Sequence, residues 1–74
     1  QMNVINNTLQ INANKTENIS IEIFGLNGFC VAKLYNGILK AGSTSFDLSS
    51  LAKGSYIVRV RANKILATRP IMLK

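Results

Sequence analysis

The chain has 74 residues, of which 47% are hydrophobic and 16% are charged, and its nine Lys and Arg against three Asp and Glu give a net charge of +6. This length predicts one domain, residues 1–74, with a single core, and the chain is too apolar for a disordered tail. It has no histidine and one cysteine, which excludes an internal disulfide, the usual zinc sites and histidine-based catalysis.

The excess of positive charge favours contacts with acidic lipid, polysaccharide, nucleic acid or protein surfaces. Nucleic acid is not an expected partner, because the lysines are scattered through turns and only Phe29 and Tyr35 among the aromatic residues are expected to reach solvent. No apolar run approaches the roughly 20 residues of a membrane-spanning helix, so we expect no transmembrane segment. No signal-peptide pattern opens the chain.

The first half of the chain alternates apolar and polar residues with a period of two, most clearly in the run Ile19–Ile23, and this predicts short β-strands. Two pairs, Asn27-Gly28 and Asn36-Gly37, predict tight hairpin turns because Asn and Gly tolerate positive φ. The strands expected here are residues 2–5, 8–13, 19–25 and 29–35.

In the second half, strands are expected at residues 43–48, 55–62 and 65–73, with turns between them that include Ala62-Asn63-Lys64. The stretch Asp47–Leu51 is too short for more than one helical turn. Pro70 cannot donate to a β-ladder, so the last strand is expected at a sheet edge or at a bulge. About seven short strands with polar turns and no long helix predict an antiparallel β-sandwich of two sheets.

Residues that could carry chemistry are few. The three carboxylates are well separated, and Asp47 precedes two serines as in an Asx turn or a helix cap, so we expect a structural role for it. Cys30 has no histidine partner, and we expect a buried or half-buried small residue instead of a nucleophile. No glycine-rich phosphate loop is present. The chain is therefore not expected to be an enzyme or to hold a metal or cofactor.

Arg59 and Arg61 alternate with valines in the strand expected at residues 55–62. On one hypothesis they are the solvent-facing half of the period-two pattern and protect the sheet from pairing with other chains. On the other hypothesis they form a basic stripe that meets an acidic partner, together with Lys33 or Arg69 from a neighbouring strand. The residues alone leave both hypotheses open.

Three stretches carry a resemblance to a known family: ISIEIFGLNGFCVAKLYNG at residues 19–37, AGSTSFDLSSLAKGSYIVRV at 41–60, and the closing PIMLK. With these, the chain resembles the type A C-terminal sorting domains of the type IX secretion system, which carries folded cargo across the bacterial outer membrane. The resemblance covers residues 8–74; residues 1–7 match poorly, since many members have a P-N-P motif before the first strand. Residues that match the family signature are Gly28, Asp47, Leu48, Leu51, Gly54, Tyr56, Val58, Val60 and Lys74.

The resemblance implies an Ig-like β-sandwich that serves as a secretion signal for a cargo protein joined upstream. It implies export through the periplasm to the outer-membrane surface or the medium, recognition by the translocon, and removal of the domain by a cell-surface sortase. On this interpretation the hairpin of residues 54–74 docks on translocon proteins, partly by edge-strand pairing.

Two further functions stay open at the level of the sequence. One is an accessory β-sandwich of a secreted polysaccharide-degrading enzyme, either a carbohydrate-binding module or a spacer, although the chain has no tryptophan for a sugar-binding platform. The other is a weak homodimer that forms through exposed edge strands.

Overall fold

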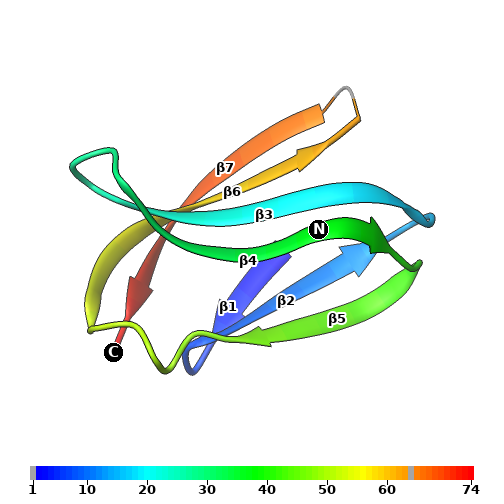
Figure 1. The fold of residues 1–74 in the computed structure, drawn as a ribbon. Coiled ribbons are helices and arrows are strands. Elements are labelled where there is room, and N and C mark those ends of the chain that lie inside the picture. The colour runs from blue at the N-terminus through cyan, green and yellow to red at the C-terminus, as the bar shows by residue number, and fades with distance from the viewer. Residues whose placement is uncertain (1, 64) are drawn as a thin grey trace.

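The structure, a computed structural model, describes residues 2–63 and 65–74, and these residues form strands and turns without a helix (Figure 1). The strands are β1 (Met2–Ile5), β2 (Thr8–Ala13), β3 (Glu17–Gly25), β4 (Cys30–Leu39), β5 (Gly42–Asp47), β6 (Gly54–Ala62) and β7 (Ile65–Leu73). The all-β prediction is confirmed, and the bounds of β1, β2 and β7 agree with the sequence pattern. Gln1 and Lys64, the latter predicted in a turn, lie outside the described residues.

The strands form two antiparallel sheets that face each other as a sandwich (Figure 1). One sheet has the order β1-β2-β5 and the other has the order β4-β3-β6-β7. In a constant-type immunoglobulin fold the fourth strand lies in the sheet of the first, second and fifth strands. Here β4 pairs with β3 instead, so the fold is an Ig-like sandwich whose fourth strand has joined the other sheet.

The core consists of leucine, isoleucine and valine side chains from the inward positions of both sheets. Leu9 of β2 and Ile21, Ile23 and Val58 of the larger sheet are completely buried. Burial of one such side chain contributes about 1.5–3 kcal/mol, which is why the period-two pattern determines the sandwich. The other buried apolar residues are Ile11, Ile19, Leu39, Leu48, Ala62, Ile71 and Leu73.

The hairpin turn predicted at Asn36-Gly37 is wrong, because β4 runs through this pair to Leu39. Asn36 pairs with Ser20 and Gly37 pairs with Ile19 across the ladder to β3. Pairing with the long strand β3 and burial of Leu39 outweigh the local turn preference of Asn-Gly. Gly37 has a φ of +153°, so the glycine provides a backbone conformation inside a strand instead of a hairpin turn.

One expectation about burial in β4 is wrong, and another holds only in part. Cys30 is exposed, because it pairs with Phe24 on the outer face of the sheet directly after the β3–β4 turn. Tyr35 is half-buried against the core, with its ring centroid 6.0 Å from that of Phe46. Phe29, in contrast, is 71% exposed, as expected.

The larger sheet has β4 and β7 as its edge strands, which confirms the edge placement predicted from Pro70. The pairing of β4 with β3 shifts register twice, between Ile21 and Glu22 and between Ile23 and Phe24. Such β-bulges disfavour pairing with a further chain. The free edge of β7 is therefore the more open of the two.

Candidate functional site

Signature residues that are far apart in the sequence meet at one end of the sandwich (Figure 1). This end, which we call the signature end, comprises the turns at residues 6–7 and 26–29, the loop at 48–53, and residues 73–74. Strand pairing brings the segments together, since Gly54 lies opposite Leu73 and Tyr56 lies opposite Gly25. The signature residues at this end or next to it are Gly28, Asp47, Leu48, Leu51, Gly54, Tyr56 and Lys74.

Short-range hydrogen bonds fold the loop that follows β5. The N–H of Ser49 donates to Asp47 Oδ1 at 3.0 Å, which confirms the predicted Asx turn, and the N–H of Leu51 donates to Leu48 O at 3.0 Å. The hydrogen bonds from Ser49 hold the pKa of Asp47 below its ordinary value of 3.8. Leu48 is 1% exposed, so its side chain anchors the loop on the core.

Tyr56 fixes the other side of the same loop. Its hydroxyl donates to Ala52 O at 2.6 Å, and its ring packs against the core. A tyrosine near the start of the sixth strand that bonds back to the preceding corner is also found in immunoglobulin domains. Gly54, where β6 begins, has a φ of +144°, and a Cβ there would meet no atom within 4 Å. A glycine is therefore required at this position because of its positive φ, and not because a side chain would clash with neighbouring atoms.

Asn7 joins three segments of the signature end, and sequence reasoning missed it. Its side-chain carbonyl accepts a hydrogen bond from Lys74 N–H at 3.0 Å, and its side-chain amide donates to Lys74 O at 2.8 Å. Its backbone carbonyl accepts from Leu48 N–H at 2.8 Å. Asn6 and Asn7 have φ values of +51° and +61°. Two asparagines between predicted strands signal this tight turn, but the contacts across the fold need the structure.

Val58 and Val60 match the signature but lie further along β6, away from the signature end. Val58 is completely buried, and Val60 is half-buried against the core. Their position gives them the role of holding β6 against the facing sheet.

Arg59 is held by its neighbours on the outer face of the larger sheet. Its Nε and Nη2 donate to Glu22 Oε1 at 3.2 and 2.6 Å, and its guanidinium carbon lies 4.4 Å from the centroid of the Phe24 ring. The hydrogen bond from Arg59 is the main cause that lowers the pKa of Glu22 from its ordinary 4.5, and the charges of Arg61 and Lys33 add to it. These contacts stabilise the sheet.

The structure keeps Arg69 out of the basic stripe hypothesised for Arg59 and Arg61, whereas Lys33 lies on their face of the sheet, opposite Glu22. Arg69 pairs with the buried Val58, and its guanidinium donates to the backbone carbonyl of Met2 in β1. Arg61 is exposed, and within the described part of the chain it donates no hydrogen bond. Of the three arginines, Arg61 is therefore the one whose guanidinium is open to a partner.

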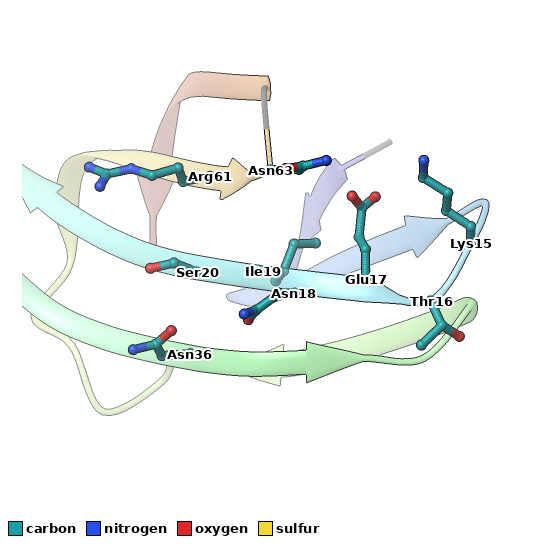
Figure 2. A pocket seen from close by; sticks show the side chains of 9 residues that line it. All are labelled: Lys15, Thr16, Glu17, Asn18, Ile19, Ser20, Asn36, Arg61 and Asn63. Carbon is teal, nitrogen blue, oxygen red and sulfur yellow. The ribbon is translucent and has the colours of Figure 1, made fainter.

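A shallow polar pocket of about 480 Å³ lies over the start of β3 and the end of β6, away from the signature end (Figure 2). Glu17, Asn36, Arg61 and Asn63 are among its lining residues, and Arg61 points away from both Glu17 and Asn63 (Figure 2). In residues 2–63 and 65–74, no three His, Cys, Asp or Glu gather where they could hold a metal ion. The same residues include no helix that is long and apolar enough to cross a membrane.

Comparison with protein families matches residues 3–74 to the family described as the secretion system C-terminal sorting domain. The chain belongs to this family. The match begins within β1, so it includes the strand that lay outside the resemblance seen in the sequence. A comparison with curated proteins finds no match.

This sorting domain is a C-terminal signal for type IX secretion, and it marks an attached upstream cargo for export to the cell surface or the extracellular medium. Domains of this family interact with the secretion machinery and are signals, not catalysts. The match does not favour an accessory carbohydrate-binding or spacer module.

Proposed function

We propose that the type IX translocon recognises the sorting domain as a folded object, through the signature end and the neighbouring hairpin of residues 54–74. The observation that carries this proposal is the convergence of signature residues from three separate segments, Gly28, residues 47–56 and Lys74, at one end of the sandwich. Burial explains Leu48, but it does not explain the exposed Lys74. A contact surface for a partner explains Lys74, and burial of Leu48 holds the loop of that surface in place.

Charge indicates the chemistry of the surface that meets the signature end. Lys53 and Lys74 are both exposed there, and the chain has a net charge of +6. Complementary potentials accelerate association and set the orientation of the two partners. The proposed translocon surface is therefore acidic. Arg61, on the outer face of β6 near its far end, is a second basic site on the hairpin.

The free edge of β7 is the second part of the proposed contact. Pro70 has no N–H, and a proline in an edge strand places its nitrogen on the free side of the strand. Thr68 lies two residues away, so its N–H faces the same free side, whereas the N–H of Ala67 faces β6. A strand of the translocon that pairs with β7 would accept the hydrogen bond of Thr68.

The removal of the domain from its cargo completes the proposal. After export, a cell-surface sortase cleaves upstream of β1 and releases the sorting domain. Mass spectrometry should then show that the reporter on the cell surface is lighter than the uncleaved fusion by the mass of the domain. Delivery of the uncleaved fusion alone would contradict this step.

A fusion to a periplasm-directed reporter tests the function. The reporter with residues 1–74 at its C-terminus should reach the surface of a host that has the type IX system. It should stay in the periplasm without the domain, or in a host that lacks the system. Truncation after Asn63 is a poor control, because it also removes Ile71 and Leu73 from the core and so destabilises the fold. Periplasmic retention of the complete fusion would contradict the function.

Two proline variants test the pairing of β7 with a translocon strand. Thr68→Pro removes a donor from the free edge and should leave the melting temperature close to that of the wild type while it lowers surface delivery. Ala67→Pro removes a hydrogen bond to β6 and should lower the melting temperature clearly. Wild-type delivery by a folded Thr68→Pro variant would contradict the edge contact.

A further inference from the structure

The β3–β4 turn and the start of β4 carry three large apolar side chains that the core does not use. Leu26, Phe29 and Val31 are 70%, 71% and 47% exposed, and we call them the apolar tip. They belong neither to the buried core nor to the half-buried residues packed against it. The turn projects beyond the body of the sandwich (Figure 1). The apolar tip therefore faces solvent for a reason other than packing within the domain.

Internal hydrogen bonds hold the turn in one conformation. The N–H of Gly28 donates to Gly25 O at 3.0 Å, and the N–H of Gly25 donates to Phe29 O at 2.9 Å. Asn27 Oδ1 accepts from Phe29 N–H at 3.2 Å, and a Cβ on residue 25 would come within 3.0 Å of that oxygen. Gly28 has a φ of +90°. Because the turn is already ordered, a partner that binds it loses little conformational entropy.

A β-bulge directs Val31 outward beside the turn. Ile23 pairs with Ala32 and Phe24 pairs with Cys30, so Val31 is the extra residue between two ladder pairs. Bulges change the direction of side chains next to binding sites and are features of the fold, not defects. The turn and the bulge are thus two local structures that both expose apolar side chains at the end of the β3–β4 hairpin.

The charges around the apolar tip indicate the kind of partner. Residues 23–32 contain no Asp, Glu, Lys or Arg, although the chain as a whole is strongly basic. Amphipathic segments that bind anionic membranes carry Lys or Arg within the same segment, and residues 23–32 carry none; the lysines at this end, Lys53 and Lys74, come from other segments. Gly25 pairs with Tyr56, so the apolar tip leaves the sheet at the signature end. The tip is therefore continuous with the surface proposed to meet the translocon.

We propose that the apolar tip inserts into an apolar cleft on a protein of the secretion machinery, with acidic groups at the rim of the cleft facing Lys53 and Lys74. This inference rests on the proposed function and adds an anchor to it. Apolar anchors that fill a dry pocket inside a polar rim supply most of the free energy of many protein interfaces. The lysines of the signature end then guide the encounter, and the apolar tip determines how long the complex lasts.

Serine substitutions in the reporter fusion test the anchor against a matched control. The double variant Leu26→Ser/Phe29→Ser should lower surface delivery about tenfold or more, the change expected when hot-spot side chains are truncated. The control Ile38→Ser changes a side chain of β4 that is 61% exposed near the opposite end of the sandwich and outside the proposed contact, and it should be delivered normally. Both variants should keep the wild-type melting temperature, because all three side chains are exposed.

The apolar-conserving variant Leu26→Met/Phe29→Leu should restore most of the delivery. Equal delivery of the tip variant and the wild type would overturn the anchor but leave the proposed function intact. Failure of the wild-type fusion to reach the surface would overturn the proposed function, and the anchor with it.

Two further measurements distinguish a protein partner of the apolar tip from a lipid surface and from a second copy of the chain. The chain should not float with vesicles of phosphatidylcholine and phosphatidylglycerol. If it does float, and Leu26→Ser/Phe29→Ser abolishes the flotation, the tip binds lipid and the proposal of a protein cleft is overturned. The chain should stay monomeric in light scattering across concentration. Association that is lost in the same variant would show that the apolar tip binds a second copy of the chain, and would overturn the proposal as well.

Discussion

The side chain of Asn7 and the backbone of Lys74 exchange two hydrogen bonds, at 2.8 and 3.0 Å, across 67 positions of the sequence. The first turn of the domain therefore holds its last residue in place. Because the backbone of Asn7 also accepts a hydrogen bond from Leu48, the β1–β2 turn, the loop after β5 and the end of β7 form one connected structure. The signature end is a defined surface for this reason.

Replacement of Asn7 by glycine should loosen the end of β7. Glycine keeps the positive φ of this position but removes both side-chain hydrogen bonds, each worth about 0.5–1.5 kcal/mol and less where solvent competes. We expect Asn7→Gly to lower the free energy of unfolding by about 1 kcal/mol in urea titrations. Asn6→Gly, at the other positive-φ position of the turn, is the control and should be close to neutral. Equal effects of the two changes would show that the contacts to Lys74 do not stabilise the domain.

Loss of the Tyr56 hydroxyl should loosen the loop at residues 48–53 without changing the core. The hydroxyl donates to Ala52 O, while the ring packs against the core, so Tyr56→Phe removes only the hydrogen bond. We expect a loss of about 1 kcal/mol in the free energy of unfolding and faster amide exchange within the loop. Tyr56→Ala also removes the packing of the ring and should cost more. A Tyr56→Phe domain as stable and as protected as the wild type would contradict this role.

Stability should depend on pH through the pair of Glu22 and Arg59. The pKa of Glu22 is lower in the folded chain than its ordinary value of 4.5, mainly because Arg59 donates a hydrogen bond to the carboxylate. The folded state therefore binds this proton less tightly than the unfolded state. The stabilisation is complete above pH 4.5 and is lost as the pH falls through the lowered pKa of the folded state.

Thermal unfolding of the wild type and Glu22→Gln as a function of pH checks this linkage. The two melting temperatures should differ near neutral pH and converge in acid, and the difference should shrink at high salt because the pair is partly exposed. A difference that stays constant across this pH range would exclude Glu22 as its source.

Single substitutions of Arg59 and Arg61 by glutamine should have different effects. Arg59→Gln breaks the bond to Glu22 and the contact with Phe24, so the melting temperature should fall. Arg61→Gln removes a guanidinium that donates no hydrogen bond within the described residues and only adds to the field on Glu22, so the melting temperature should stay nearly unchanged while surface delivery of a fused reporter decreases. Normal delivery with Arg61→Gln would contradict a contact between Arg61 and an acidic partner, and the role of this arginine would then be solubility.

Much of the fold could be predicted from the sequence because period-two alternation places one face of each strand in the core. Ile19, Ile21 and Ile23 are buried as the pattern requires. The exceptions arise where pairing across the fold outweighs local preference. Asn36-Gly37 has the local signal of a hairpin, yet its ladder with β3 keeps it inside a strand.

The candidate site could be predicted only in part. The Asx turn at Asp47 follows from neighbouring residues and is confirmed. The contacts of Asn7 and Arg69 could not be predicted, because they join segments that only the sandwich brings together. Exposure of Cys30 follows from a bulge and from the position of the β3–β4 turn, neither of which leaves a clear pattern in the sequence.

The most direct test of the signature end is a comparison of two charge reversals in the reporter fusion. Lys53→Glu/Lys74→Glu alters exposed side chains at the signature end, and Lys15→Glu/Lys40→Glu makes the same change in net charge at the opposite end of the sandwich. If the translocon reads the signature end, the first variant should lose about tenfold in surface delivery while the second is delivered like the wild type, with both folded. Equal delivery of the two folded variants would contradict recognition at this end.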